Sequence, residues 1–323
     1  MDASTRNPLG AEMRSEPNAP FFNAHWAGAE VIEISVVICT RNRARQLHAC
    51  LERFERQRTT VRWELLIVDN ASTDDTRAVA DAFIEGLDVP AGTLFEGARG
   101  NGAGRNAALP WARGAVIGFT DDDCYVADDY VEQLARTFRE HPVDYIAGRI
   151  LLFDPDDAPV TIAESTIPFD VPGNRPVPGA FVQGANMAFR REPLLRQGGF
   201  DPVFGAGARF AGEDWEVAMR VSDAGGAGRY EPNVLVWHHH GRKAPDVPAL
   251  WRFYLIGEGA MYAKTLLHSR FKWAAFKMLL IALRAQYTWR PTRPFFFLVR
   301  GFVQYLALQM RLGRRARSGA AMS

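Results

Sequence analysis

The sequence predicts an α/β fold with a mostly parallel, Rossmann-like sheet, followed by a C-terminal amphipathic helical segment. Short apolar runs rich in β-branched residues alternate with amphipathic stretches between residues 34 and 119, the pattern of strands joined by crossover helices. Beyond residue 240 the apolar residues recur at helical spacing. A chain of 323 residues that is 47% hydrophobic can bury one large core of this kind.

The elements of the first half can be assigned in order. The first predicted strand is Ile34 to Cys39, and the helix after it has Leu47, Leu51 and Phe54 on one face. Further strands are predicted at Leu65 to Val68, Thr93 to Phe95 and Ala115 to Phe119, with helices from about Asp74 and near Arg105 to Ala112. Because crossover helices cover both faces of a parallel sheet, these strands should be buried.

The second half is less regular. After Val143 to Phe153 come residues 154 to 178, rich in proline and aspartate, and loops of this length tend to be lids or binding loops. A strand is expected at Phe181 to Phe189, a helix at Glu213 to Ser222, a last strand at Arg229 to Trp237 and only helices beyond it. The expected division is a loose leader at residues 1–30, an α/β domain at 31–245 and a basic helical region at 246–323.

Three adjacent carboxylates, Asp121, Asp122 and Asp123, follow the strand at Ala115 to Phe119. Neighbouring carboxylates repel one another, and ligands of open α/β sheets gather at the carboxyl ends of the strands. A divalent cation such as Mg²⁺ or Mn²⁺, held by oxygen ligands and carrying a diphosphate, would account for the cluster. The alternative is a solvated turn or cap before a helix that begins near Ala127.

Charge is distributed unevenly along the chain. Residues 241–323 hold 15 Lys or Arg against 2 Asp or Glu, whereas residues 1–240 hold 23 against 35. A basic tail on an acidic body indicates an anionic partner surface.

Three cysteines without CxxC spacing indicate neither a disulfide framework nor a zinc site, which favours the cytoplasm. Lys277 and Arg300 interrupt the two best apolar stretches, so no membrane-spanning helix is expected.

Six motifs, in order and at matching spacing, resemble family 2 glycosyltransferases with the GT-A fold. They are Ser35 to Arg43, Leu66 to Asp74, Gly104 to Asn106, Phe119 to Asp123, Gly184 to Met187 and Gly212 to Trp215. The resemblance covers roughly residues 33 to 240. It implies transfer of a sugar from a UDP-, dTDP- or GDP-sugar to a hydroxyl of a glycan or lipid-linked acceptor, with inversion and with a divalent metal.

The resemblance also implies roles for individual residues. The nucleotide sugar would be bound by Thr40, Arg41, Asp69, Arg105, Asn106, Asp121, Asp122 and Asn186. The metal would be held by Asp121, Asp123 and His238, with Mg²⁺ and Mn²⁺ both suitable. Asp214 would deprotonate the acceptor hydroxyl, with Glu213 beside it.

Structural alternatives exist for several of these residues. Asp69 could form an Asx turn, and Asn186 could hydrogen-bond within a sheet edge. Glu213 and Asp214 could simply complement a helix dipole. His238 could belong to an exposed loop end rather than to a metal site.

Two basic stripes distinguish the tail. Arg270, Lys277 and Arg284 share one helical face, and Arg293, Arg300 and Arg311 share another. With wide apolar faces around them, they indicate helices lying on an anionic membrane surface, on the cytoplasmic side of the cell membrane. The alternative is packing against the catalytic domain or a dimer partner, which leaves self-association open. Nucleic acid is not expected as a partner.

Two other function classes fit parts of the sequence. A sugar-phosphate nucleotidyltransferase would also use an α/β sheet and a metal, but it should have a glycine-rich loop after the first strand, where this chain has Thr40 to Arg43 without glycine. A non-catalytic lipid- or nucleic-acid-binding protein would explain the basic tail and leave the carboxylates of the body without a purpose.

Overall fold

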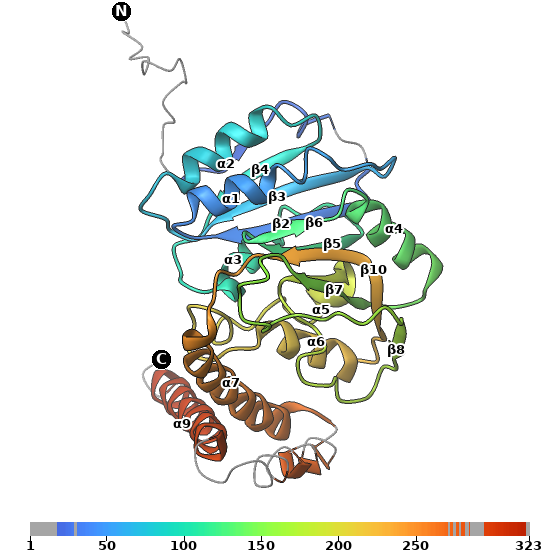
Figure 1. Ribbon diagram of the computed structural model, residues 1–323. Helices are drawn as coiled ribbons and strands as arrows, with labels where there is room; N and C mark the ends of the chain where they lie inside the picture. The colour runs from blue at the N-terminus through green and yellow to red at the C-terminus, as the bar shows by residue number, and fades with distance from the viewer. Residues whose placement is uncertain are drawn as a thin grey trace, which may run out of the picture.

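The computed structural model describes residues 18–28, 31–270, 272–273, 276–277, 279–281, 284 and 294–320. Its centre is a ten-stranded sheet in the order β1-β4-β3-β2-β5-β9-β7-β10-β6, with β8 beside β10 (Figure 1). The strands are β1 (Phe21–Phe22), β2 (Ile34–Thr40), β3 (Trp63–Asp69), β4 (Ala91–Phe95), β5 (Val116–Asp121), β6 (Cys124–Val126), β7 (Tyr145–Leu152), β8 (Phe169–Val171), β9 (Asn186–Arg190) and β10 (Gly228–His238). The helices are α1 (Ala44–Leu51), α2 (Thr76–Glu85), α3 (Asn101–Ala108), α4 (Tyr130–Glu140), α5 (Arg191–Arg196), α6 (Glu213–Asp223), η1 (Ala244–Asp246), α7 (Val247–His268) and α9 (Pro294–Ala320).

Alternating side chains of the buried strands supply two hydrophobic cores, one on each face of the sheet. In β2, Val36 and Ile38 pack with residues of α1, α2 and α4, whereas Val37 points to the opposite core, which includes residues of α6, α7 and α9. Successive side chains of a strand point to opposite faces. The near-continuous apolar runs of the sequence therefore become strands buried on both sides, as expected for crossover helices.

The parallel part of the sheet is β4-β3-β2-β5, together with the pair β7 and β10. The α/β prediction is thus confirmed. Strand β9 runs antiparallel to both β5 and β7 and joins the two parallel groups into one mixed sheet. The prediction of a mostly parallel sheet therefore holds for the first half and is too simple for the second.

Two local predictions need correction. The acidic triplet is followed by strand β6, which pairs with β10, and the helix α4 begins only at Tyr130. Phe21 and Phe22 pair with β4, so the second half of the supposed loose leader adds an edge strand to the sheet. Residues 1–17, and Arg293 of the second basic stripe, lie outside the described residues.

The C-terminal region contributes to the same core. Helices α7 and α9 pack side by side (Figure 1), and Leu298 and Tyr305 of α9 are each 1% exposed. Their contact is close because Gly259 and Gly301 leave room for backbone: a Cβ at Gly301 would lie 1.9 Å from the carbonyl oxygen of Ile256. Among the described helices, none is long and apolar enough to cross a bilayer.

Candidate active site

A cavity of about 930 Å³ opens at the carboxyl ends of β2 and β5. Register brings these ends together, because Thr40 lies opposite Asp69 of β3 and Cys39 lies opposite Asp121 of β5. Thr40, Arg41 and the acids of the triplet line this cavity. The cavity therefore lies at the edge of the sheet where the sequence predicted ligand binding.

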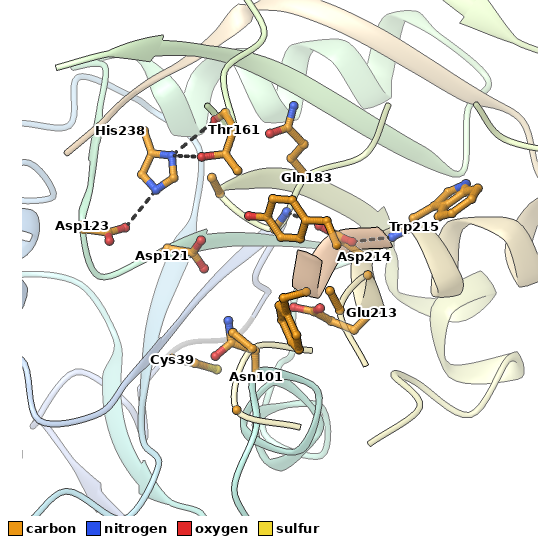
Figure 2. A pocket seen from close by; sticks show the side chains of 18 of the residues that line it. Cys39, Asn101, Asp121, Asp123, Thr161, Gln183, Glu213, Asp214, Trp215 and His238 are labelled. Carbon is orange, nitrogen blue, oxygen red and sulfur yellow. Dashed lines mark hydrogen bonds and ion pairs between the residues drawn. The ribbon is translucent and has the colours of Figure 1, made fainter. Parts of the chain in front are cut away.

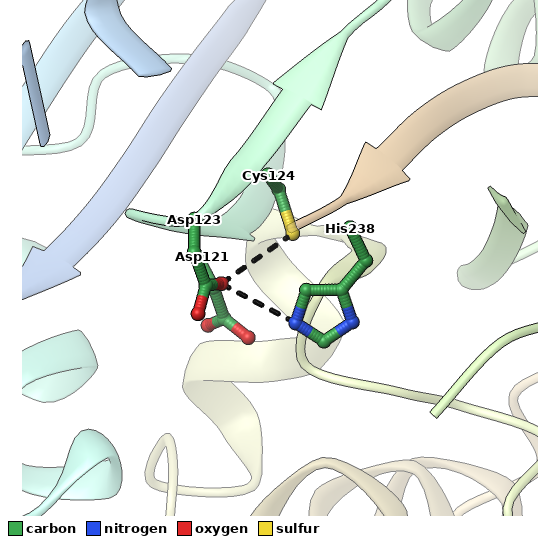
Figure 3. Close-up of side chains that lie close together, drawn as sticks. All are labelled: Asp121, Asp123, Cys124 and His238. Carbon is green, nitrogen blue, oxygen red and sulfur yellow. Dashed lines mark hydrogen bonds and ion pairs between the residues drawn. The ribbon is translucent and has the colours of Figure 1, made fainter. Parts of the chain in front are cut away.

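Strand β6 determines how the acidic triplet meets His238. Cys124 of β6 lies opposite His238 of β10, and the backbone N–H of His239 donates to the carbonyl of Asp123 at 2.8 Å. As a result, the Nε2 atom of His238 is 3.3 Å from Oδ1 of Asp123 (Figure 3). Asp121 points to the same space, so the three predicted metal ligands are brought together.

These three side chains suit a hard divalent cation. Adjacent ligands of an octahedral Mg²⁺ or Mn²⁺ ion lie about 3 Å apart, which matches the Asp123 to His238 spacing of 3.3 Å. Cys124 is also near, with its thiol 4.0 Å from Asp123. Burial, and then the charge of Asp123, raises the pKa of this thiol well above its usual value, and Mg²⁺ and Mn²⁺ prefer oxygen ligands to soft sulfur.

Charges around the cluster are balanced by hydrogen bonds. Burial alone would raise the pKa of Asp123, but the hydrogen bond and charge of His238, together with Arg43, lower it. In the same way burial lowers the pKa of His238, and Asp123 outweighs this and raises it. Asp122 accepts from Thr40 Oγ1 at 2.7 Å and from Arg43 Nη1 at 3.1 Å. Its carboxylate is thus held beside the metal candidates by protein groups.

Asp214 lies at the other end of the cavity. Figure 2 shows Asp123 and His238 on one side, Asp214 with Trp215 on the other and Asp121 between them. The two oxygens of Asp214 accept backbone N–H groups of Gly184 and Trp215, each at 2.7 Å. Burial, followed by the charge of Glu213, raises the pKa of Asp214 to about 7. A carboxylate with this pKa can accept a proton near neutral pH.

Arg105 connects the two ends. It is 2% exposed, and it donates from Nη1 to Glu213 at 2.6 Å and from Nη2 to Asp121 at 3.1 Å. Nη2 also reaches the carbonyl oxygen of Gly184 at 3.3 Å. The role of Arg105 toward the nucleotide sugar stays a prediction, and in this structure its guanidinium pairs with acidic groups of both ends and links them.

Three predicted nucleotide-sugar residues lie outside the cavity lining. Asp69 accepts the backbone N–H of Ser72, three residues on, at 2.9 Å, which fits the alternative of a turn-forming residue. Asn106 is paired with the backbone of Phe200 through both ends of its amide. Asn186 is 1% exposed and donates to the carbonyls of Arg149 and Val234. The structure gives these side chains contacts within the protein, so their part in binding the nucleotide sugar stays a prediction.

Other cavity residues were missed. Arg43 pairs with Asp123 at 2.6 Å, and its place in the motif after the first strand was the available signal. Asn70, not Asp69, lines the cavity. Gln183, Arg242, Trp251 and Tyr254 also line it, but they come from segments whose role is decided by tertiary packing.

A strand-end acidic cluster facing a buried carboxylate across one cavity is the arrangement of a GT-A enzyme. Residues 35–197 match the profile described as Glycosyl transferase family 2. The chain therefore belongs to glycosyl transferase family 2.

Two curated relatives illustrate the similarity. The pre-mycofactocin glycosyltransferase of Mycobacterium tuberculosis is 27% identical over 232 residues, which cover 69% of this chain and 46% of that protein. The glycosyltransferase AglE of Haloferax volcanii is 29% identical over 118 residues, covering 36% of this chain and 39% of that protein. The chain thus spans less than half of the length of these relatives.

Solved structures share the fold. The mannosyltransferase PcManGT from Pyrobaculum calidifontis, in complex with GDP-Man and Mn²⁺, has a TM-score of 0.60 at 20% identity, covering 91% of this chain and 81% of that one. TarS 1-349 of S. aureus, in complex with UDP-GlcNAc, has a TM-score of 0.61 at 16% identity, covering 85% and 80%. At these identities the likeness concerns the fold alone.

Proposed function

We propose that this enzyme transfers a sugar from a nucleotide-diphosphate sugar to an acceptor hydroxyl, with inversion and with the help of a divalent cation. The observation that carries the proposal is the arrangement of one cavity between two acidic ends, with Asp123 and His238 at one and Asp214 at the other. Solved structures with the same fold hold GDP-Man with Mn²⁺ and UDP-GlcNAc, which supports a nucleotide-sugar donor.

The donor would lie with its nucleotide at the ends of β2 and β3, against Thr40, Arg41 and Asn70. Asp121, Asp123 and His238 would hold the cation, which would neutralise the charge that develops on the departing nucleoside diphosphate. The neighbouring Arg43, which already contacts Asp122 and Asp123, would add positive charge at the same end.

Asp214 would act as the base at the opposite end. It takes the proton of the acceptor hydroxyl while the acceptor oxygen forms a bond to the anomeric carbon. The bond from that carbon to the phosphate oxygen breaks, and its electron pair leaves with the nucleoside diphosphate. Attack from the side opposite the leaving group inverts the anomeric configuration. Arg105, bonded to Glu213 and Asp121, would keep the base and the donor end at a fixed separation.

The proposal is tested by screening UDP-, dTDP- and GDP-sugars for binding and cleavage. We expect one nucleotide class to raise the melting temperature when Mn²⁺ or Mg²⁺ is present and to lose this effect with EDTA, because a ligand that binds only the folded state stabilises it. The same nucleotide sugar should release nucleoside diphosphate. Release of pyrophosphate from a nucleoside triphosphate and a sugar phosphate would instead indicate a nucleotidyltransferase, and stabilisation by none of the donors would contradict the proposal.

The proposal includes a site of action on the inner face of the cell membrane, with the region from residue 246 as the docking element and a glycan or lipid-linked acceptor near that surface. No acidic residue follows Glu258 in the sequence, whereas 12 Lys or Arg do. In the same region large apolar side chains are exposed, among them Trp273, Ile281, Phe295, Phe296, Val303 and Met310. Apolar insertion and attraction of basic residues to anionic lipid, about 1 kcal/mol each, would act together.

Co-sedimentation with vesicles tests this docking. We expect the protein to pellet with vesicles that contain phosphatidylserine, and to pellet less without this lipid or at high salt, which screens charge. A triple variant with serine at Phe295, Phe296 and Val303 should pellet several-fold less, because it loses the apolar contribution. The matched control is Ile167→Ser, which removes an exposed apolar side chain elsewhere. Equal pelleting of both variants, with no dependence on phosphatidylserine or salt, would show that these helices serve only in packing.

A further inference from the structure

One wall of the cavity is aromatic and belongs to α7. Trp251, Tyr254 and Glu258 all line the cavity, and their spacing of i, i+3 and i+7 places them on one face of the helix. Trp251 is 53% exposed. Its ring meets that of Tyr254 edge to face, with the centroids 6.1 Å apart and the planes at 89°. Together the two rings form one surface of the cavity, with Tyr254 toward the interior and the exposed Trp251 toward the solvent.

This wall lies at the end of the cavity that holds the proposed base. Burial raises the pKa of Tyr254 to about 12, and although Arg242 opposes this, the charges of Asp214, Asp121 and Glu213 add to it, so the phenol lies in the field of these three carboxylates, with Asp214 the largest contributor among them. Gly257 fixes the position of the helix there, since a Cβ at this residue would lie 2.4 Å from the carbonyl oxygen of Ala211. Ala211 stands two residues before Glu213, so the helix that carries the two aromatic rings packs against the segment that leads to the proposed base.

The nucleotide of the donor does not account for this wall. The edge formed by Thr40 and Arg41 lies at the carboxyl ends of the parallel strands, where nucleotides bind in open α/β sheets. A molecule that presents a hydroxyl to Asp214 lies in the same cavity as Tyr254 and the more exposed Trp251. The acceptor is therefore the ligand that this wall faces.

The chemistry of the wall favours a saccharide. Trp and Tyr rings offer a flat apolar face with a polar edge, and the apolar C–H face of a sugar ring can lie on such a surface. Gln183, Arg242 and Glu258 line the same cavity and can bond to sugar hydroxyls. An acyl or prenyl chain would require an uninterrupted apolar wall, since unpaired polar groups are costly to bury.

We propose that Trp251 and Tyr254 form an acceptor subsite for the sugar next to the one that reacts, so that the enzyme prefers an acceptor with at least two sugars to a single sugar. The inference rests on the proposed function, because it takes Asp214 as the base that receives the proton of the acceptor. Trp251, the more exposed of the two rings, contacts the second sugar and determines the preference.

The experiment compares matched p-nitrophenyl mono- and disaccharides of glucose, galactose, mannose and N-acetylglucosamine as acceptors, with the donor from the nucleotide-sugar screen. The readout is the ratio of kcat/KM for the disaccharide to that for the monosaccharide, which general damage to the fold leaves unchanged. We expect a ratio of about ten for the wild-type enzyme, the scale of one aromatic contact. Trp251→Ala should bring it close to one, and Trp251→Phe should retain most of it.

Trp111→Ala is the control, since Trp111 is also partly exposed but lies outside the cavity lining, and it should leave the ratio unchanged. The subsite is overturned if Trp251→Ala keeps the wild-type ratio, if the wild-type enzyme favours monosaccharides, or if it releases nucleoside diphosphate from its donor yet uses none of these saccharides. Failure of the wild-type enzyme to cleave any nucleotide sugar would overturn the proposed function, and the subsite with it.

Discussion

Replacing Asp214 by asparagine is expected to lower the turnover number for sugar transfer by at least about a hundredfold, the usual scale for loss of a general base, and to leave donor binding nearly intact. The asparagine amide can keep one of the two backbone hydrogen bonds that the carboxylate makes to Gly184 and Trp215. It cannot accept the proton of the acceptor hydroxyl. Donor affinity is measured by titration with the nucleotide, and turnover by release of nucleoside diphosphate in the presence of acceptor.

The pH dependence of kcat/KM gives a second readout of the same residue. Because burial and Glu213 raise the pKa of Asp214 to about 7, the carboxyl is protonated and inactive below this pH, and kcat/KM should rise as pH increases through about 7. The Asp214→Asn enzyme should lack this rise of kcat/KM with pH. Asp223→Asn makes the same chemical change in the same helix, outside the cavity lining, and should retain it. A loss of donor affinity as large as the loss of turnover would instead show that the role of Asp214 is structural and not catalytic.

The fold could be predicted from the sequence where the signal is local. The runs Ile34 to Cys39 and Leu65 to Val68 became β2 and β3 because their β-branched and aliphatic residues fill both cores. The boundary of α3 was missed by four residues, since Gly100, Gly102 and Gly104 have low helix propensity. Here tertiary contact overrides propensity, because a Cβ at Gly102 would already lie 3.0 Å from the carbonyl oxygen of Phe204.

The short strands could not be predicted because their partners are distant in sequence. Strand β6 has three residues, and only its pairing with β10, more than 100 residues away, makes it a strand. The same pairing places His238 beside Asp123, so the proposed metal cluster depends on a contact that no local pattern contains. Its members were nevertheless chosen correctly as neighbours, since each ends a predicted strand and strand ends of a sheet meet at one edge.

The direction of the Asn186 side chain could not be predicted from the sequence either. Asn186 stands opposite Thr120 of β5, but its side chain turns to the carbonyls of Arg149 and Val234. Gly148 makes this possible, as a Cβ there would lie 2.2 Å from the amide nitrogen of Asn186. The motif in the sequence identified Asn186 as a candidate, but the direction of its amide depends on which carbonyl groups of neighbouring strands can accept a hydrogen bond.

Asp123→Ala is expected to abolish sugar transfer and to remove the metal-dependent part of nucleotide binding. The carboxylate is the one that meets both His238, at 3.3 Å, and Arg43, at 2.6 Å. Its loss would take away a cation ligand and leave His238 with one protein carboxylate fewer beside it. Binding of the donor nucleotide is measured by calorimetric titration with Mn²⁺ and with EDTA, and the two titrations should become equal in the variant.

Cys124→Ala is the matched control for this prediction. It removes the fourth member of the same cluster, a sulfur atom that suits Mg²⁺ and Mn²⁺ less well than oxygen does, and it should therefore preserve the difference between the Mn²⁺ and EDTA titrations. If Asp123→Ala also preserved that difference, the cation would have to be held without this carboxylate. If Cys124→Ala abolished it while Asp123→Ala did not, sulfur would be a ligand, and a softer ion than Mn²⁺ or Mg²⁺ would fit the cluster better.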